Sequence, residues 1–286
     1  MKQLLITLAL ALTATGMHAE QTLTVGPLTM TVDDTHGGKI LSLKYGDTEI
    51  ISQSRFPESF GSTFWTSPQK EWNWPPVPEF DKQPYTVARR DGHLLLTSGV
   101  SQKLGLSVSK EFAVDSAACA FVITYGIKNE SQATRQVAPW EITRVQNEGV
   151  IFFNAPLDGI TPAGLMNFQA KDGAVWYEAD EAPRNRKINA DGKGWLAYSA
   201  KGLLLVKTFQ DLGHNEPAPG EAEIQVYVNQ RKTYIELESQ GAYATLAPGE
   251  QLQWTVRWHL LSVGDSQPSQ GQLLSAVREV LARQGK

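Results

Sequence analysis

Apolar and polar residues alternate with a period of two in one segment of this chain after another. The pattern is clearest at residues 104–114, 121–128 and 252–260. In the last of these segments the apolar residues share one parity: Leu252, Trp254, Val256, Trp258 and Leu260. Because successive side chains of a strand point to opposite faces, the alternation indicates half-buried antiparallel strands, and Trp254 and Trp258 are expected in the core.

Ten shorter apolar segments, separated by turns rich in Gly, Asp and Asn, are also predicted strands: 28–32, 39–45, 85–89, 93–98, 149–154, 174–178, 194–199, 203–209, 223–229 and 233–239. Only residues 271–286 have the apolar spacing of a helix. The chain is therefore predicted to be all-β and antiparallel, with one C-terminal helix. Two layered sheets and a closed barrel fit the pattern equally well. Long loops are expected at 52–84 and 155–193.

The first 19 residues have the layout of a secretory signal peptide. Lys2 precedes an apolar run from Leu4 to Leu12, and small residues lead to Ala19. The run is too short to span a bilayer. We expect residues 1–19 to be removed, a single domain over residues 20–286, and a periplasmic or secreted product.

Charge and cysteine content exclude several classes of protein. The formal net charge of −4 becomes more negative by one when Lys2 is removed, which argues against nucleic-acid binding. No later segment resembles a membrane span. Cys119 is the only cysteine, so no intramolecular disulfide can form. A chain of this length buries roughly 70% or more of its unfolded surface and needs no such link.

An aromatic, proline-rich segment at residues 63–81 contains Trp65, Trp72 and Trp74. The prolines that follow Trp74 favour an extended surface segment, because proline fixes φ and restricts the residue before it. Large aromatic side chains in such a loop either complete a core or bind a ligand. We expect ligand binding, so that alanine at Trp72 or Trp74 would have little effect on stability.

The common catalytic motifs are absent, and no metal or cofactor is expected, because each histidine stands alone in the sequence. Two acidic segments lie within strand patterns instead. Glu236 and Glu238 share the polar face of one strand, and Trp140, Glu141 and Arg144 follow one another in another strand. An ordinary solvated sheet face is the alternative explanation.

Four segments carry a resemblance to a known family: GGKILSLKYGDTEII, KNES, PWEITR and YIELESQGAYATLAPGEQLQWTVRWHLL. The similarity spans most of residues 36–261. They resemble the galactose mutarotase-like superfamily, within it an uncharacterised and often exported branch. The resemblance implies a large antiparallel β-supersandwich with a sugar bound in a cleft on its concave face.

The resemblance also assigns a residue role. Members carry a general-base glutamate in a Leu-Glu-Pro-Gln-like context, followed by a Pro-Gly-Glu turn, and this implies that Glu238 is the base. The acid histidine of the family is absent, and Trp140-Glu141 stands roughly in its place. Glu141 is then either a protonated acid beside an apolar wall or, next to Arg144, an ionised acceptor. We expect weak or no mutarotation.

The leading hypothesis is an exported carbohydrate-binding protein. A pyranose packs its C–H face on an indole ring and needs planar polar partners for its hydroxyls. The predicted binding residues are Trp65, Trp72, Trp74, Trp140, Arg144 and Glu236. The alternatives are an aldose 1-epimerase that uses Glu238 and Glu141, a glycan-cleaving enzyme with paired glutamates, and an envelope protein whose aromatic loop binds a protein partner.

Overall fold

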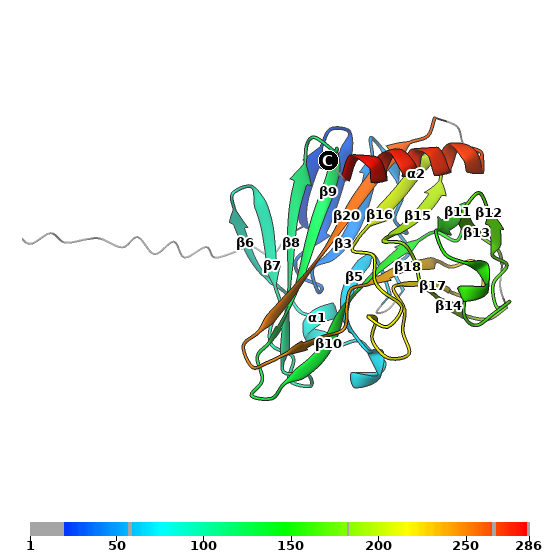
Figure 1. Ribbon diagram of the computed structural model, residues 1–286. Coiled ribbons are helices and arrows are strands. Elements are labelled where there is room, and N and C mark those ends of the chain that lie inside the picture. Colours follow the sequence, from blue (N-terminus) through cyan, green and yellow to red (C-terminus); the bar gives the residue numbers. More distant parts are fainter. Residues whose placement is uncertain (1–19, 57–58, 182, 265–266, 285–286) are drawn as a thin grey trace, which may run out of the picture.

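The computed structural model describes residues 20–56, 59–181, 183–264 and 267–284, and these residues form two facing antiparallel sheets with a helix at one end (Figure 1). Layered sheets are therefore the correct alternative, and no barrel forms from the described residues. The predicted signal peptide lies outside the described residues.

The first sheet contains ten of the described strands. Eight of them follow one another across the sheet: β1 (Glu20–Val25), β2 (Leu28–Asp33), β3 (Lys39–Tyr45), β5 (Ser62–Ser67), β10 (Arg135–Val145), β18 (Ile235–Gln240), β17 (Ile224–Val228) and β14 (Arg186–Ala190). Two short strands pair at its margins, β4 (Thr48–Glu49) with β3 and β19 (Ala244–Leu246) with β10.

The second sheet also contains ten of the described strands. Their order is β12 (Gln169–Lys171), β13 (Ala174–Glu178), β11 (Val150–Phe153), β15 (Trp195–Ala200), β16 (Leu203–Thr208), β20 (Gln251–Ser262), β9 (Ala120–Asn129), β8 (Leu106–Asp115), β7 (His93–Thr97) and β6 (Thr86–Arg90). The three segments with the clearest alternation became β8, β9 and β20, which are neighbours in this sheet.

The core lies between the two sheets. Phe64 of the first sheet stacks on Tyr125 of the second, with ring centroids 4.3 Å apart and planes 7° from parallel. Trp254 and Trp258 are buried in the same core, as predicted from their parity on β20. Each sheet thus buries one face of its alternating strands against the other.

The helix α2 (Gln270–Gln284) lies across β15, β16 and β20 (Figure 1). Its apolar face is buried, including Leu273, Leu274, Val277 and Val280. The other helical segments are short: α1 (Pro78–Asp81) and the 3₁₀ turns η1 (Gln69–Glu71) and η2 (Leu157–Gly159). The predicted C-terminal helix is confirmed.

The two segments predicted as long loops contain strands that decide where the site lies. Strand β5 lies within 52–84, and all six of its residues are buried, so that it shows no alternation. Strand β14 lies within 155–193 and forms one edge of the first sheet. Trp65 consequently belongs to a central strand and not to a surface loop.

Candidate functional site

The polar residues predicted for a sugar site gather on the face of the first sheet that points away from the second sheet, here called the outer face. Strands β10 and β18 pair so that Arg144 lies opposite Glu236 and Ile142 lies opposite Glu238. Trp140 has the same parity as Arg144. Residues directly opposite one another on paired strands point to the same face, so Trp140, Arg144, Glu236 and Glu238 share the outer face.

Glu238 is almost fully buried, with 1% of its surface exposed. Its Oε2 accepts a hydrogen bond from Nε1 of Trp140 at 2.9 Å and lies 2.8 Å from Nζ of Lys187. Its Oε1 is buried and has no hydrogen-bond partner. Burial raises the pKa of Glu238, although the Lys187 ammonium opposes this effect. One oxygen of this buried carboxylate is therefore left without a hydrogen-bond partner.

Gln225 supplies a donor beside this acceptor. It lies directly opposite Glu238 where β17 pairs with β18, and 1% of its surface is exposed. Its Nε2 is buried and, like Oε1 of Glu238, has no hydrogen-bond partner. Sequence reasoning missed Gln225, although the alternation of β17 places it on the polar parity of that strand. A buried donor next to a buried acceptor can hold one hydroxyl group from both sides.

Lys187 is the exposed member of the pair it forms with Glu238. Its side chain is 34% exposed, while that of Glu238 is 1% exposed. Its Nζ also lies 4.6 Å from the centre of a Trp140 ring, within the range of a cation–π interaction. Strand β14 was not predicted from the sequence, so Lys187 was missed with it.

Arg144 and Glu236 form a second ion pair on the outer face. Nη2 of Arg144 lies 2.7 Å from Oε1 of Glu236, and Nη1 donates to the carbonyl oxygen of Phe60 at 3.2 Å. Arg144 is 1% exposed and its guanidinium lies 5.7 Å from a Trp65 ring. Arg144 thereby links strand β18 to the chain at Phe60. Direct contact of Arg144 and Glu236 with a sugar stays a prediction.

Most of the tryptophans predicted to bind a sugar pack against one another in a buried cluster. The Trp65 ring makes edge contacts with the rings of Trp72 and Trp140, each at 5.5 Å between centroids. Trp65 and Trp72 are 5% and 3% exposed, and Nε1 of Trp72 donates to the carbonyl of Thr66 at 2.7 Å. The expectation that Trp72 projects from a loop is therefore wrong. Only Trp74, 55% exposed, presents its ring to solvent among these four.

A buried aspartate anchors the segment that carries these tryptophans. Oδ1 of Asp81, at the end of α1, accepts hydrogen bonds from Thr63 and from Nε1 of Trp65, both at 2.9 Å. Nζ of Lys39 lies 3.0 Å from Oδ2. Burial alone would raise the pKa of Asp81, but Lys39 and these donors lower it below its usual value. The segment is thus fixed to the outer face.

The predicted pairing of Glu141 with Glu238 is wrong in geometry, because the two carboxylates lie on opposite faces of the first sheet. Glu141 points into the core, where its Oε2 lies 2.5 Å from Nζ of Lys207 and both side chains have no exposed surface. Its Oε1 accepts from Tyr125 at 2.7 Å and from Trp258 at 3.0 Å. Neighbours in a strand alternate between faces, so Trp140 and Glu141 cannot serve one site.

A hollow of about 430 Å³ opens beside the outer-face residues. Its lining includes Asn189, which lies directly opposite Gln225 where β14 pairs with β17, and Glu221. Glu221 is held in place, because Ser67 and Gln240 both donate to its Oε2 at 2.5 Å. The hollow thus borders strand β14 near its pairing with β17, but Gln225 and Glu238 do not line it.

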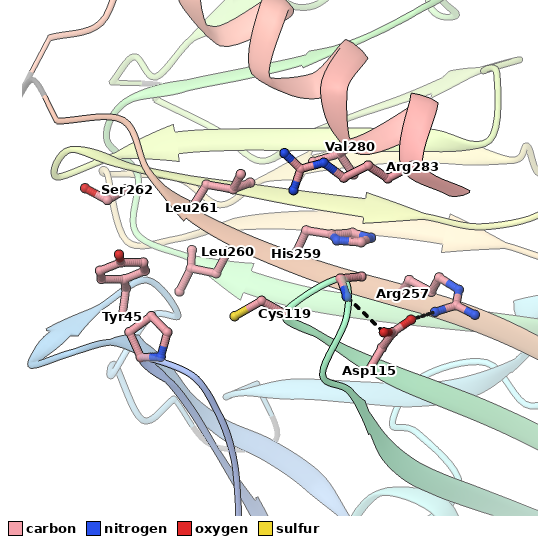
Figure 2. Close-up of a pocket in the computed structure, with 12 residues that line it drawn as sticks. Tyr45, Asp115, Cys119, Arg257, His259, Leu260, Leu261, Ser262, Val280 and Arg283 are labelled. Carbon is pink, nitrogen blue, oxygen red and sulfur yellow. Dashed lines mark hydrogen bonds and ion pairs between the residues drawn. The ribbon is translucent and has the colours of Figure 1, made fainter. Parts of the chain in front are cut away.

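A separate cavity of about 570 Å³ lies near the end of α2, between β20 and the turn that joins β8 to β9 (Figure 2). Two of its polar side chains pair with each other, because Nη1 of Arg257 lies 2.9 Å from Oδ2 of Asp115. Burial and the positive charge of Arg257 lower the pKa of His259 to about 4, so this ring is neutral at pH 7. Cys119 lies in the turn with φ +49° and lines the cavity.

Two further kinds of feature are absent from the described residues. No group of three or more His, Cys, Asp or Glu side chains in that part of the chain is arranged to hold a metal ion. Neither α1 nor α2 is long and apolar enough to cross a membrane, and no other described helix is.

Comparison with known proteins supports the fold. No protein-family model and no curated protein matches the chain. Among solved structures, a galactose mutarotase-like protein from Lactobacillus casei has a TM-score of 0.62 at 9% identity, covering 85% of this chain and 100% of that one. A galactose mutarotase related enzyme from Lactobacillus acidophilus has a TM-score of 0.58 at 10% identity, covering 87% and 100%.

A protein from Escherichia coli K12, provisionally assigned as an aldose 1-epimerase, has a TM-score of 0.57 at 12% identity, covering 85% of this chain and 99% of its own. Identities this low carry information about architecture only. With two large antiparallel sheets and matches that span nearly whole proteins, the chain has the galactose mutarotase-like fold.

Proposed function

We propose that this protein binds a carbohydrate on the outer face of its first sheet, around Glu238. The observation that carries the proposal is the pair of buried, unpartnered groups, Oε1 of Glu238 and Nε2 of Gln225, on neighbouring strands. Leaving a buried polar group unsatisfied costs about 1–3 kcal/mol, so a ligand that pairs with both groups recovers that free energy. A sugar hydroxyl does so, because it donates and accepts at once.

The surroundings suit a sugar in two further ways. The Trp140 indole is buried and orients the Glu238 carboxylate through its Nε1 hydrogen bond. Trp74 stands exposed 6.1 Å from the Trp65 ring, at the border of the same cluster, and can pack against the apolar C–H face of a pyranose. Apolar rings with a few convergent polar groups are the usual composition of small-ligand sites.

We also propose that the protein works outside the cytoplasm, since residues 1–19 have the layout of a signal peptide. Mass spectrometry of the protein from the periplasmic fraction or the medium should find Glu20 as its first residue. Recovery of the chain from the cytoplasm with Met1 intact would contradict export.

The binding proposal is tested by titrating the purified mature protein with D-glucose, D-galactose and D-mannose while intrinsic tryptophan fluorescence is recorded, alongside a glycan array. Replacing Gln225 with leucine should weaken the binding of a responding sugar by about tenfold or more, because a donor worth about 1.5 kcal/mol is lost.

The matched control is Gln253→Leu, because Gln253 is an exposed residue of β20 in the second sheet. Binding should not change in this variant. No response to any sugar or glycan, or equal losses in the two variants, would reject a carbohydrate site on the outer face.

A further inference from the structure

We propose that the cavity of about 570 Å³ near the end of α2 binds a small apolar carboxylic acid, with the carboxylate at Arg257 and Arg283 and the hydrocarbon part on the apolar wall beside Tyr45. The inference is independent of the carbohydrate site proposed above, because neither Gln225 nor Glu238 lines this cavity.

The cavity exists because β20 is longer than its neighbour β9. The last pair between the two strands joins His259 to Ala120, whereas β20 continues to Ser262. Beyond that pair, β16 is the one described strand that still pairs with β20, so the edge toward β9 is left uncovered. The helix α2 adds Val280 and Arg283 to the lining, and residues three apart share one face of a helix. Regular elements of the fold thus bound the cavity.

One side of the cavity carries positive charge. Figure 2 shows Arg257, Arg283 and Asp115 on the same side. Burial has the largest effect on the pKa of His259, and the charges of both arginines lower it further, so both guanidinium groups lie within electrostatic range of this ring. The neutral His259 adds no charge, and Asp115 offsets one of the two guanidinium groups. The lining therefore keeps one positive charge, which an anion would complement.

The existing contacts of the two arginines leave them able to bind an anion. Oδ1 of Asp115 accepts the backbone N–H of Ala118 at 2.9 Å, and this hydrogen bond together with Arg257 lowers the pKa of Asp115. Asp115 contacts a single nitrogen of Arg257, whereas a guanidinium has five N–H donors. Nη2 of Arg283 lies 4.0 Å from Glu279, and an ion pair between side chains as exposed as these contributes little. Both arginines can therefore donate to a carboxylate.

The opposite side of the cavity is apolar. Figure 2 shows Tyr45, Leu260 and Leu261 there, and Pro27 also belongs to the lining. Apolar walls with a few convergent polar groups, around a volume of roughly 300–1,000 Å³, are usual for small-ligand sites. Hydrocarbon at one side and positive charge at the other fit an acid with one carboxylate and an apolar body.

Calorimetric titration of the purified protein with sodium hexanoate and with hexanamide tests the role of the charge. The two molecules have the same length, and the uncharged amide should bind about tenfold more weakly or worse, because hydrogen bonds to charged groups are the stronger ones. Sodium butanoate is two methylenes shorter and should also bind roughly tenfold more weakly, since each buried methylene contributes about fourfold in affinity.

Replacing Arg283 with glutamine tests the position of the site. The side chain is 66% exposed, so Arg283→Gln should fold normally and weaken hexanoate binding by about tenfold or more. Arg278→Gln is the matched control, because Arg278 is an exposed arginine of the same helix whose Nη2 donates to the carbonyl of Asp172 at 3.3 Å. Its affinity for hexanoate should match that of the wild type.

Cys119 supplies a reporter inside the cavity. It is the only cysteine of the chain, it is partly exposed, and it lines the cavity, so alkylation by iodoacetamide followed by mass spectrometry reports on this place alone. Saturating hexanoate should slow the alkylation severalfold, and hexanamide at the same concentration should slow it less.

Several results would overturn the inference. These are no binding of hexanoate, equal affinities for the acid and the amide, equal effects of Arg283→Gln and Arg278→Gln, and an unchanged alkylation rate of Cys119 with the acid bound. Gln225→Leu should leave hexanoate binding unchanged, because Gln225 belongs to the proposed carbohydrate site. The two proposals can thus fail separately.

Discussion

Replacing Lys207 with methionine is expected to destabilise the folded protein by about 3–5 kcal/mol. The change leaves the Glu141 carboxylate buried in the core without its cation, at a position where neither side chain has exposed surface. The same Nζ donates to Oγ1 of Thr143 at 3.0 Å, and this hydrogen bond is lost too. Urea unfolding followed by circular dichroism measures the free energy of unfolding.

A double variant tests whether the uncompensated charge is the cause. Glu141→Gln together with Lys207→Met removes both charges but keeps a side-chain oxygen for Tyr125 and Trp258, so it should recover most of the lost stability. Lys128→Met is the control, since Lys128 pairs with Glu130 at the surface and its loss should cost about 1 kcal/mol or less. A loss in Lys207→Met as small as in this control would contradict the prediction.

Alanine at Trp72 is expected to cost about 3–5 kcal/mol, the usual loss when a large buried aromatic side chain is removed. The Trp72 ring is 3% exposed, contacts the rings of Trp65 and Trp140, and donates a hydrogen bond to Thr66. This reverses the expectation from the sequence, which treated Trp72 as a free ligand-binding ring.

Trp74→Ala is the matched control, two residues along the same segment. Its ring is 55% exposed, so its removal should change the free energy of unfolding by about 0.5 kcal/mol or less. Urea unfolding of both variants measures the two changes in the free energy of unfolding. Equal stability of the two would mean that the tryptophan cluster does not support the fold.

The antiparallel strands and the terminal helix were predictable because they depend on local patterns, whereas these patterns fitted a sandwich and a barrel equally well. A strand with one buried face shows the period of two within its own residues, and β8, β9, β20 and α2 all carried such signals. Strand β5 carried none, because every residue in it is buried and no polar face interrupts it. Strand β14, RKINA, is short and mixes polar and apolar residues without a clear alternation. It is recognised as a strand only from its pairing with β17.

Within the site, alternation was enough to place Glu236 and Glu238 on one face of their strand, and only the pairing of β10 with β18 in the structure adds Trp140 and Arg144 to that face. The same alternation, applied to Trp140 and Glu141, would have excluded Glu141, because adjacent residues of a strand point to opposite faces. Its burial against Lys207 adds a long-range ion pair between the sheets that no local pattern contains.

The partners of Glu238 were beyond the reach of local patterns. Lys187 is 51 residues away in the chain and meets Glu238 only because β14, β17 and β18 lie side by side in the first sheet. Period-two alternation tells which face of a strand is polar, but it is silent on which strands become neighbours. That choice is made by the packing of the whole sandwich, and it alone places an ammonium group beside the buried carboxylate.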